Sequence, residues 1–96
     1  MTFAVEFTDA ARNDLFGILE FITADNPRRG ASFVDELETF IRERLAVFPD
    51  SGTRIGKHRF IVFRNYVAVY AVDEAMRRVR VVLVTEGHRR WRSAFE

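Results

Sequence analysis

The sequence predicts an α+β domain in which two helices cover one face of an antiparallel β-sheet. Two long segments with apolar residues at helical spacing occupy the N-terminal half, and three segments rich in β-branched residues follow one another between residues 58 and 85. A short strand-like segment precedes the helices, so the predicted order is β-α-α-β-β-β. Strands that are segregated from helices, rather than alternating with them, are typical of this class. The length of 96 residues fits one domain, residues 1–96, with no repeat or linker.

The first predicted elements are a strand and a helix. Apolar and polar residues alternate over Phe3–Phe7, which favours a short strand. Thr8 is a good N-cap for the helix that follows. Along that helix, apolar residues at i, i+3, i+4 and i+7 form one stripe: Leu15, Ile18, Leu19 and Ile22.

The second helix begins after the break Asp25-Asn26-Pro27. Asn26 is suited to the N-cap and Pro27 to the first helical position. Pro49 ends the helix. Its apolar stripe is wide: Phe33, Val34, Leu37, Phe40, Ile41, Leu45 and Phe48. Two helices joined by so short a connection must run antiparallel, as a helical hairpin.

The C-terminal half is predicted to form a sheet. A loop at Asp50–Gly56 precedes strands at His58–Arg64, Tyr66–Asp73 and Arg77–Thr85. Because residues i and i+2 of a strand share a face, the last strand should turn three residues to the core: Val79, Val81 and Leu83. Its opposite face holds Arg78, Arg80, Val82 and Val84. The strand at 66–73 is apolar on both faces, so the tail, a partner chain or a second subunit should cover part of its outer face.

Composition narrows the classes of function. The net charge of +1 hides a split, because residues 1–53 carry −5 and residues 54–96 carry +6, with arginine as 14 of the 15 basic residues. The basic half is suited to an anion or an acidic partner, although it can also complement the chain's own acidic helices. Without cysteine, disulfides and cysteine-based zinc sites are excluded, and no metal or cofactor is expected. There is no signal peptide or membrane-length apolar run, so we expect a cytoplasmic protein.

The tail after the last strand holds the densest functional signal. Within five residues it carries His88, Arg89, Arg90, Trp91 and Arg92. Such a cluster can bind phosphate, carboxylate, a nucleobase or a protein groove, and the alternative is a basic tail in solvent. The tryptophan either contacts a target or anchors the tail to the sheet.

One enzymatic hypothesis survives. A metal-independent ribonuclease needs a base, an acid and cations that stabilise the phosphorane. Histidine is the side chain most suited to acid and base catalysis near neutral pH, and His88 lies two residues from Glu86, while Arg78, Arg80 and Arg89 can hold phosphate. The alternative is that His88 is a surface residue with no catalytic role.

An ordered set of segments over nearly the whole chain resembles the RelE/ParE superfamily of toxins from bacterial type II toxin–antitoxin systems. The segments are Val5–Ala11, Asp14–Ile22, Asp25–Ala31, Phe33–Glu38, Leu45–Gly52, Arg64–Tyr70 and the tail. The ParE-like branch fits best, because its members often end in His-Gly-Arg-Arg-Asp-Trp-Arg. The corresponding stretch here agrees at Gly87, Arg89, Trp91 and Arg92, and departs at Glu86, His88 and Arg90.

The resemblance also helps to choose between two activities. RelE-like members cut messenger RNA on the ribosome, whereas ParE-like members are associated with poisoning DNA gyrase and have no nuclease activity. RelE-like nucleases carry lysines at positions near Phe60 and Val62, an arginine at the position of Val67, and a tyrosine near Ser93. Since apolar side chains cannot move protons or stabilise a phosphorane, the resemblance implies a target-binding toxin more than an enzyme. A ribonuclease that uses His88 and Glu86 with Arg89, or an inactive relative that only binds antitoxin, are the alternatives.

The implied partners are DNA gyrase, or alternatively the ribosome and messenger RNA, and an antitoxin encoded beside the chain. The target-binding candidates are Arg78, Arg80, His88, Arg89, Arg90, Trp91 and Arg92. An antitoxin segment with acidic and apolar residues would suit the basic half and the apolar side chains that lie off the main helical stripes. The antitoxin-binding candidates are therefore Phe16, Phe21, Phe40, Arg59 and Arg64.

Overall fold

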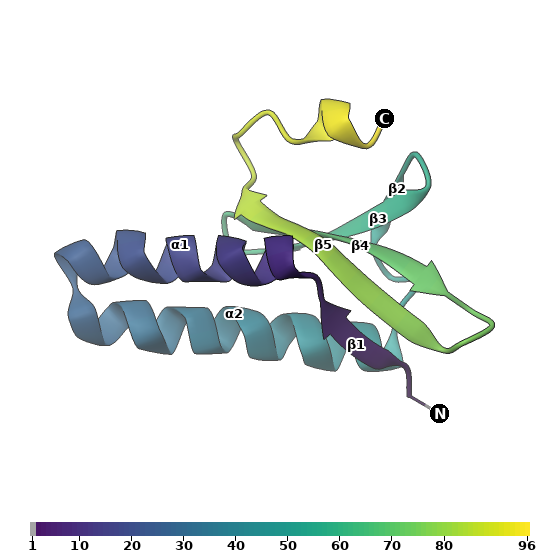
Figure 1. The fold of residues 1–96 in the computed structure, drawn as a ribbon, viewed down its shortest axis with the longest axis horizontal. Coiled ribbons are helices and arrows are strands. Elements are labelled where there is room, and N and C mark those ends of the chain that lie inside the picture. Colours follow the sequence, from purple (N-terminus) through teal and green to yellow (C-terminus); the bar gives the residue numbers. More distant parts are fainter. Residues whose placement is uncertain (1) are drawn as a thin grey trace.

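Two helices pack on one face of a five-stranded sheet, and the C-terminal tail crosses the other face (Figure 1). The computed structural model describes residues 2–96. The elements in chain order are β1 (Ala4–Phe7), α1 (Asp9–Asp25), α2 (Pro27–Val47), β2 (Thr53–Ile55), β3 (His58–Phe63), β4 (Tyr66–Asp73), β5 (Arg78–Glu86) and a short 3-10 helix η1 (Arg92–Ala94). The predicted α+β class and helical hairpin are confirmed.

The hairpin is defined by its caps and by one close approach. The Thr8 Oγ1 accepts from the Ala11 N–H at 3.1 Å, and the Asn26 Oδ1 accepts from the Arg29 N–H at 3.1 Å, so both predicted N-caps are present. A Cβ at Gly30 of α2 would lie 2.1 Å from the Thr23 Oγ1 of α1. Glycine therefore lets the helices meet closely just after their one-residue connection.

The sheet is mixed and not wholly antiparallel as predicted. Its strand order is β1-β5-β4-β3-β2, and β1 runs parallel to β5, with Ala4 opposite Arg78 and Phe7 opposite Val81. The other neighbours are antiparallel. The parallel pair joins strands from opposite ends of the chain, so no turn sequence between them predicts the pairing.

The segment predicted as a loop at 50–56 contains strand β2. It pairs antiparallel with β3, which places Arg54 opposite Arg59. Three residues are too few to show an alternation that distinguishes a strand from a loop. Gly56 makes the tight connection, with a φ of +56° that favours glycine.

A β-bulge in β5 overturns part of the predicted sorting of faces. Tyr70 of β4 pairs with Val81 and Val69 with Leu83, so Val82 is the extra residue. Val79 and Val81 face the helices as predicted, but Leu83 packs on the tail side. Val84, predicted to lie on the outer face, is 2 % exposed in the helix-side core. One inserted residue thus reverses the alternation beyond it.

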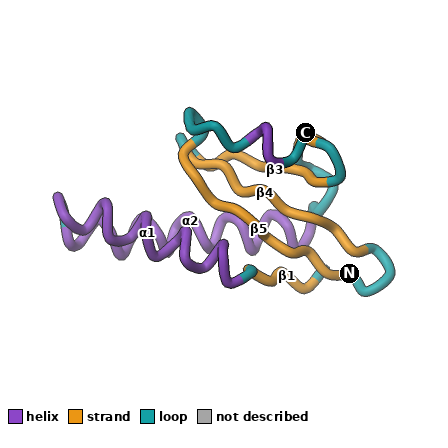
Figure 2. The backbone as a smooth tube through the Cα atoms, turned by 45° about the horizontal axis from the view of Figure 1, so that its top comes forward, coloured by secondary structure: helices purple, strands orange, loops and turns teal. Residues whose placement is uncertain are grey.

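Two apolar clusters sandwich the sheet. The larger lies under the helices, and the smaller, under the tail, consists of Ile55, Phe60, Val67, Val69 and Trp91. The tail follows a path above the sheet, opposite the helices (Figure 2). Of the three predicted covers for the outer face of β4, the structure therefore shows the tail.

The helices match their apolar stripes except at one end. Phe33, Leu37, Ile41 and Leu45 are buried, whereas Phe48 is exposed, because it lies at the C-cap beyond the last turn of α2. Neither helix among residues 2–96 has the length and hydropathy that crossing a membrane requires.

Candidate functional site

The tail is held close to the end of β5 by backbone hydrogen bonds. The Gly87 N–H donates to the Asn65 carbonyl in the β3–β4 turn at 2.8 Å, and the Arg89 N–H donates to the Glu86 carbonyl at 3.1 Å. The chain then turns back over the sheet and forms η1. The basic residues after β5 therefore lie on an ordered segment.

Trp91 anchors this segment. Its side chain is 5 % exposed, and its ring meets Phe60 edge-on with centroids 4.9 Å apart. Its Nε1–H donates to the Gly87 carbonyl at 3.3 Å, and the Arg92 guanidinium lies 4.8 Å from the ring centroid. Of the two hypotheses for Trp91, the geometry supports the anchor, because the buried ring holds the tail against the sheet.

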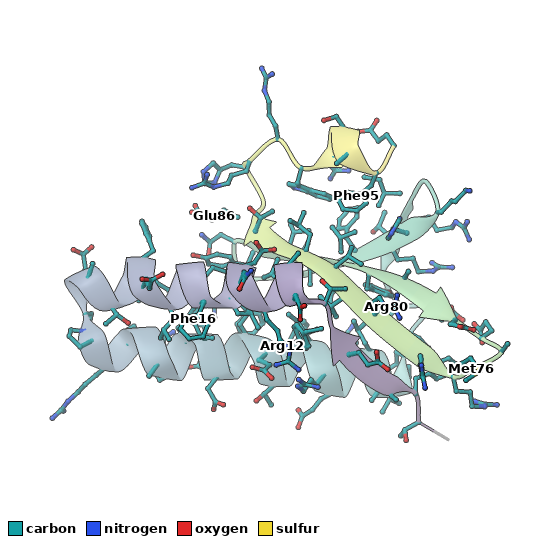
Figure 3. The ribbon with its side chains drawn as sticks, in the orientation of Figure 1. Arg12, Phe16, Met76, Arg80, Glu86 and Phe95 are labelled. Carbon is teal, nitrogen blue, oxygen red and sulfur yellow. The ribbon has the colours of Figure 1, made fainter. Side chains whose placement is uncertain are left out.

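The far end of the tail is fixed against the β2–β3 turn. The Phe95 side chain, labelled in Figure 3, packs on the tail-side cluster. Its ring meets the His58 ring edge-on, with centroids 5.0 Å apart. A Cβ at Gly56 would lie 2.0 Å from the Phe95 carbonyl oxygen. The tail is thus held at both ends.

A groove with a basic rim and an apolar floor lies between β5 and the tail. Its volume is about 610 Å³, and its floor is formed by Val82 and Leu83. The residues that complete it are Thr85, His88, Arg89, Arg90, Trp91, Ala94 and Phe95. Within residues 2–96, Arg90 forms no ion pair, so its charge faces solvent. The groove can accept an acidic segment that also has apolar side chains.

Glu86 contacts both other residues of the predicted ribonuclease site, His88 and Arg89. Its Oε2 lies 3.4 Å from the His88 Nδ1 and its Oε1 lies 3.8 Å from the Arg89 Nη2. Tyr66 stands directly opposite Glu86 on β4. Burial raises the pKa of the Tyr66 hydroxyl, and the Glu86 charge raises it further while Arg89 opposes the shift.

Sequence reasoning missed one member of this region, Asp14 of α1. Its Oδ2 accepts from the Val84 N–H at 2.9 Å. Asp14 thus supplies a hydrogen-bond partner for a β5 amide beyond Val81, where the pairing with β1 ends. Burial raises the pKa of the Asp14 carboxyl, and this hydrogen bond partly offsets the shift. Asp14, Tyr66, Glu86 and Arg89 line a cavity of about 260 Å³. The available signal was the place of Asp14 within the apolar stripe, next to Leu15.

The structure does not gather all the target-binding candidates. Arg80 and Glu86 lie toward opposite ends of β5 (Figure 3). At about 3.3 Å per residue, Arg78 lies about 26 Å along the strand from Glu86. Arg78 instead pairs with Glu6 of β1, its Nε 3.5 Å from the Glu6 Oε1.

The antitoxin-binding candidates are also spread over the molecule. Phe16 and Phe21 on α1 are 67 % and 62 % exposed, as their positions off the main stripe predicted. Phe40, predicted to lie off the main stripe, is instead half-buried on the helix-side core, where its ring packs against Phe63 at 4.9 Å between centroids. The other two candidates contact the chain itself: Arg59 donates to the Gly52 carbonyl at 2.9 Å, and Arg64 lies 3.3 Å from a carboxylate oxygen of α2. In the part of the chain that the structure describes, no three histidine or carboxylate side chains are grouped to hold a metal ion.

Comparison with known proteins identifies the group to which this arrangement is similar. Residues 5–91 match the family described as ParE toxin of type II toxin–antitoxin system, parDE. No curated protein matches the chain in sequence.

Solved structures share the fold at low sequence identity. A chain from the chromosomal ParDE toxin–antitoxin system of P. aeruginosa has a TM-score of 0.76 and 13% identity, covering 88% of this chain and 95% of that one. A mutant of E. coli toxin RelE in the free state gives 0.72 and 17%, covering 99% and 94%. A chain of the RelBE2 toxin–antitoxin complex of Mycobacterium tuberculosis gives 0.67 and 22%, covering 90% and 92%. At these identities the likeness shows the fold alone.

Proposed function

This chain belongs to the ParE toxin family of type II toxin–antitoxin systems, and from that membership we propose that it arrests growth by poisoning DNA gyrase until a cognate antitoxin neutralises it. The proposal separates it from the ribosome-dependent nucleases that share its fold. The separation depends on the chemistry of the sheet face under the tail.

The supporting observation is the apolar cluster on that face. Phe60 and Val67 occupy the positions where the resemblance implies a lysine and an arginine in RelE-like nucleases, and both are buried. Trp91 packs against Phe60, so the tail covers this surface. A buried apolar face supplies neither cations for a phosphorane nor groups that transfer protons. Instead, this apolar face holds the tail in place through its packing with Trp91.

The proposed contact surface is the groove beside the tail. His88, Arg89 and Arg90 are exposed on its rim, and Val82 and Leu83 form the floor. The arginine guanidinium groups on the rim would attract and orient an acidic protein surface. The apolar floor would bury an apolar side chain of that surface. The target would therefore present carboxylates around an apolar side chain.

The Glu86–His88 pair keeps a ribonuclease as the second candidate. The two side chains lie 3.4 Å apart and are joined to Arg89. However, a general acid and a general base must reach the leaving and attacking oxygens from opposite sides of the phosphate. Side chains that contact each other leave no space for the phosphate between them. If His88→Ala stops transcript cleavage and growth arrest together, the nuclease is the correct reading.

Growth arrest tests the proposal in cells. Truncation before Gly87 is unsuitable as a test, because it would also expose the apolar cluster around Phe60. The double variant Arg89→Gln and Arg90→Gln removes two rim charges and leaves the Trp91 anchor in place. We expect cells that express it without antitoxin to grow, whereas the control Arg28→Gln, an exposed charge on the first turn of α2, stays toxic. Arrest by both variants would reject the groove as the contact surface.

The antitoxin is proposed to bind the exposed aromatic residues of α1. Phe16 and Phe21 are large exposed apolar side chains, which are common at protein interfaces. We expect Phe16→Ser with Phe21→Ser to abolish co-purification with the neighbouring gene product. Val62→Ser, at an exposed apolar site on β3, should leave it intact. Retention of the complex by the double variant would place the antitoxin elsewhere.

A further inference from the structure

We propose that the β2–β3 turn forms a second site, which binds a phosphodiester group of a nucleic-acid backbone. The site lies on the other side of the Gly56 turn from the tail groove. Its cations are Arg54, Lys57 and Arg59. It does not depend on the proposed action on gyrase.

Two arginines stand directly opposite each other in this hairpin. Arg54 of β2 pairs with Arg59 of β3. Like charges at directly opposed positions of an antiparallel pair destabilise it, because their Cβ atoms are about 5 Å apart. Among residues 2–96 neither arginine has a carboxylate within ion-pairing distance. An anion between them would turn this repulsion into attraction.

One of the two guanidinium groups is already oriented. The Arg59 Nη1 donates to the Gly52 carbonyl at 2.9 Å and to the Asp50 carbonyl at 3.3 Å. Arginine has five N–H donors in a planar fork, so the Nε and Nη2 donors remain for a ligand. A fork fixed in this way loses little freedom when it binds an oxyanion.

The cavity is suited to a single phosphate group. Its volume is about 220 Å³, and Lys57, the only lysine in the chain, lines it together with the two arginines. Asp50 and Glu74 also line it, but neither pairs with these three cations. Three cations and two carboxylates leave one positive charge. That charge balances the single negative charge of a phosphodiester better than it balances a phosphate dianion.

The tail stabilises the turn that carries the site. Gly56 and His58 of the turn contact Phe95, and the same tail carries Arg89 and Arg90 near its start. The tail extends over the sheet toward the β2–β3 turn (Figure 1). Arg54 and Arg59 lie on the sheet face opposite the tail, because their strand neighbours Ile55 and Phe60 pack in the tail-side cluster, so this site is separate from the tail groove.

The test is the salt dependence of binding to a short, fluorescently labelled DNA duplex, measured by anisotropy with the purified chain. Each phosphate contact contributes a factor of about 3.5 to the loss of affinity between about 50 and about 200 mM salt. Because the proposed site holds one phosphate, we expect Arg54→Gln to remove part of that loss, and the double variant with Lys57→Gln to reduce it by the full factor of about 3.5. The control Arg28→Gln, remote on α2, should match the wild type. Arg59 is left intact because it also holds the loop.

Amide chemical shifts identify the ligand. With ¹⁵N-labelled protein, the duplex should shift the amides of residues 54–59, and inorganic phosphate should shift them less at equal concentration. Shifts with a polyglutamate peptide but none with the duplex would assign the site to an acidic protein and overturn the proposal. Stronger shifts with inorganic phosphate than with the duplex would make it a site for free phosphate, which also overturns it. An unchanged salt dependence in both variants would show that the turn does not contact DNA. None of these measurements contains gyrase, so they are independent of the proposed toxin activity.

Discussion

Trp91→Ala tests the role of the tail as a docked structural element. The side chain is 5 % exposed, and burial of about 200 Å² of an aromatic side chain at about 25 cal/mol per Å² corresponds to about 5 kcal/mol. Changes of a buried aromatic residue to alanine cost about 3–5 kcal/mol. We therefore expect a loss of about 3 kcal/mol in the free energy of unfolding, because the tail releases its packing on Phe60.

The assay is urea denaturation followed by circular dichroism, with hydrogen exchange of the tail amides. The neighbouring exposed residue supplies the control, since Arg90→Ala should change the free energy of unfolding by less than about 0.5 kcal/mol. Hydrogen exchange at the Gly87 and Phe95 amides should accelerate only in the tryptophan variant. Equal stability of the two variants, with unchanged exchange in the tail, would refute the anchor.

Three further predictions follow from buried contacts elsewhere. Gly30→Ala should lower the free energy of unfolding, measured by urea denaturation, by about 1–3 kcal/mol, because its Cβ would press on α1. Gly17→Ala has open space around its Cβ and should raise the free energy of unfolding by up to about 1 kcal/mol. Equal effects of the two variants would contradict the close approach of the helices. Tyr70→Phe should lower the free energy of unfolding by about 1–3 kcal/mol, because the Tyr70 hydroxyl accepts from the Gly52 N–H and donates to the Pro49 carbonyl. Tyr66→Phe should leave the free energy of unfolding nearly unchanged in the same measurement. A larger loss in Tyr66→Phe than in Tyr70→Phe would contradict these hydrogen bonds. The raised pKa of Asp14 means that the folded chain binds a proton more tightly than the unfolded chain, so stability falls as pH rises from the ordinary value of 3.8 through the raised value. Asp14→Asn keeps an acceptor and should remove that part of the pH dependence, and parallel pH profiles of the two proteins would contradict it.

Local patterns predicted the elements well because local chemistry determines them. Thr8 and Asn26 cap the two helices as their side chains suggested. The stripes bury Leu15 of α1 and Phe33, Leu37, Ile41 and Leu45 of α2, whereas Phe48 at the end of α2 is exposed. The double-sided apolar pattern of β4 also predicted that something covers its outer face. The tail is that cover, through Trp91.

The errors share a different physical origin. The parallel pairing of β1 with β5 joins residues more than seventy positions apart, and no local pattern records it. The bulge at Val82 exchanges the roles of Leu83 and Val84, although both are equally apolar in the sequence. Asp14 lies one residue before Leu15 of the α1 stripe, yet its hydrogen-bond partner is the Val84 amide of β5. Each case depends on a tertiary contact.

The target-binding candidates divide in the same way. The tail residues His88, Arg89 and Arg90 are adjacent in sequence and therefore share one groove. Arg78 lies on the same strand as Glu86, but the length of that strand separates it from the tail, and it pairs with Glu6 of β1. Membership of one strand therefore did not predict membership of one site.

The most direct test of the central claim is a DNA supercoiling assay with purified gyrase, run beside a ribosome-dependent messenger RNA cleavage assay. The account predicts that the wild-type chain and Arg28→Gln inhibit supercoiling, that the Arg89→Gln and Arg90→Gln double variant does not, and that transcripts remain intact throughout. Full supercoiling at a large excess of wild-type chain, together with cleaved transcripts, would contradict it and identify the chain as a nuclease.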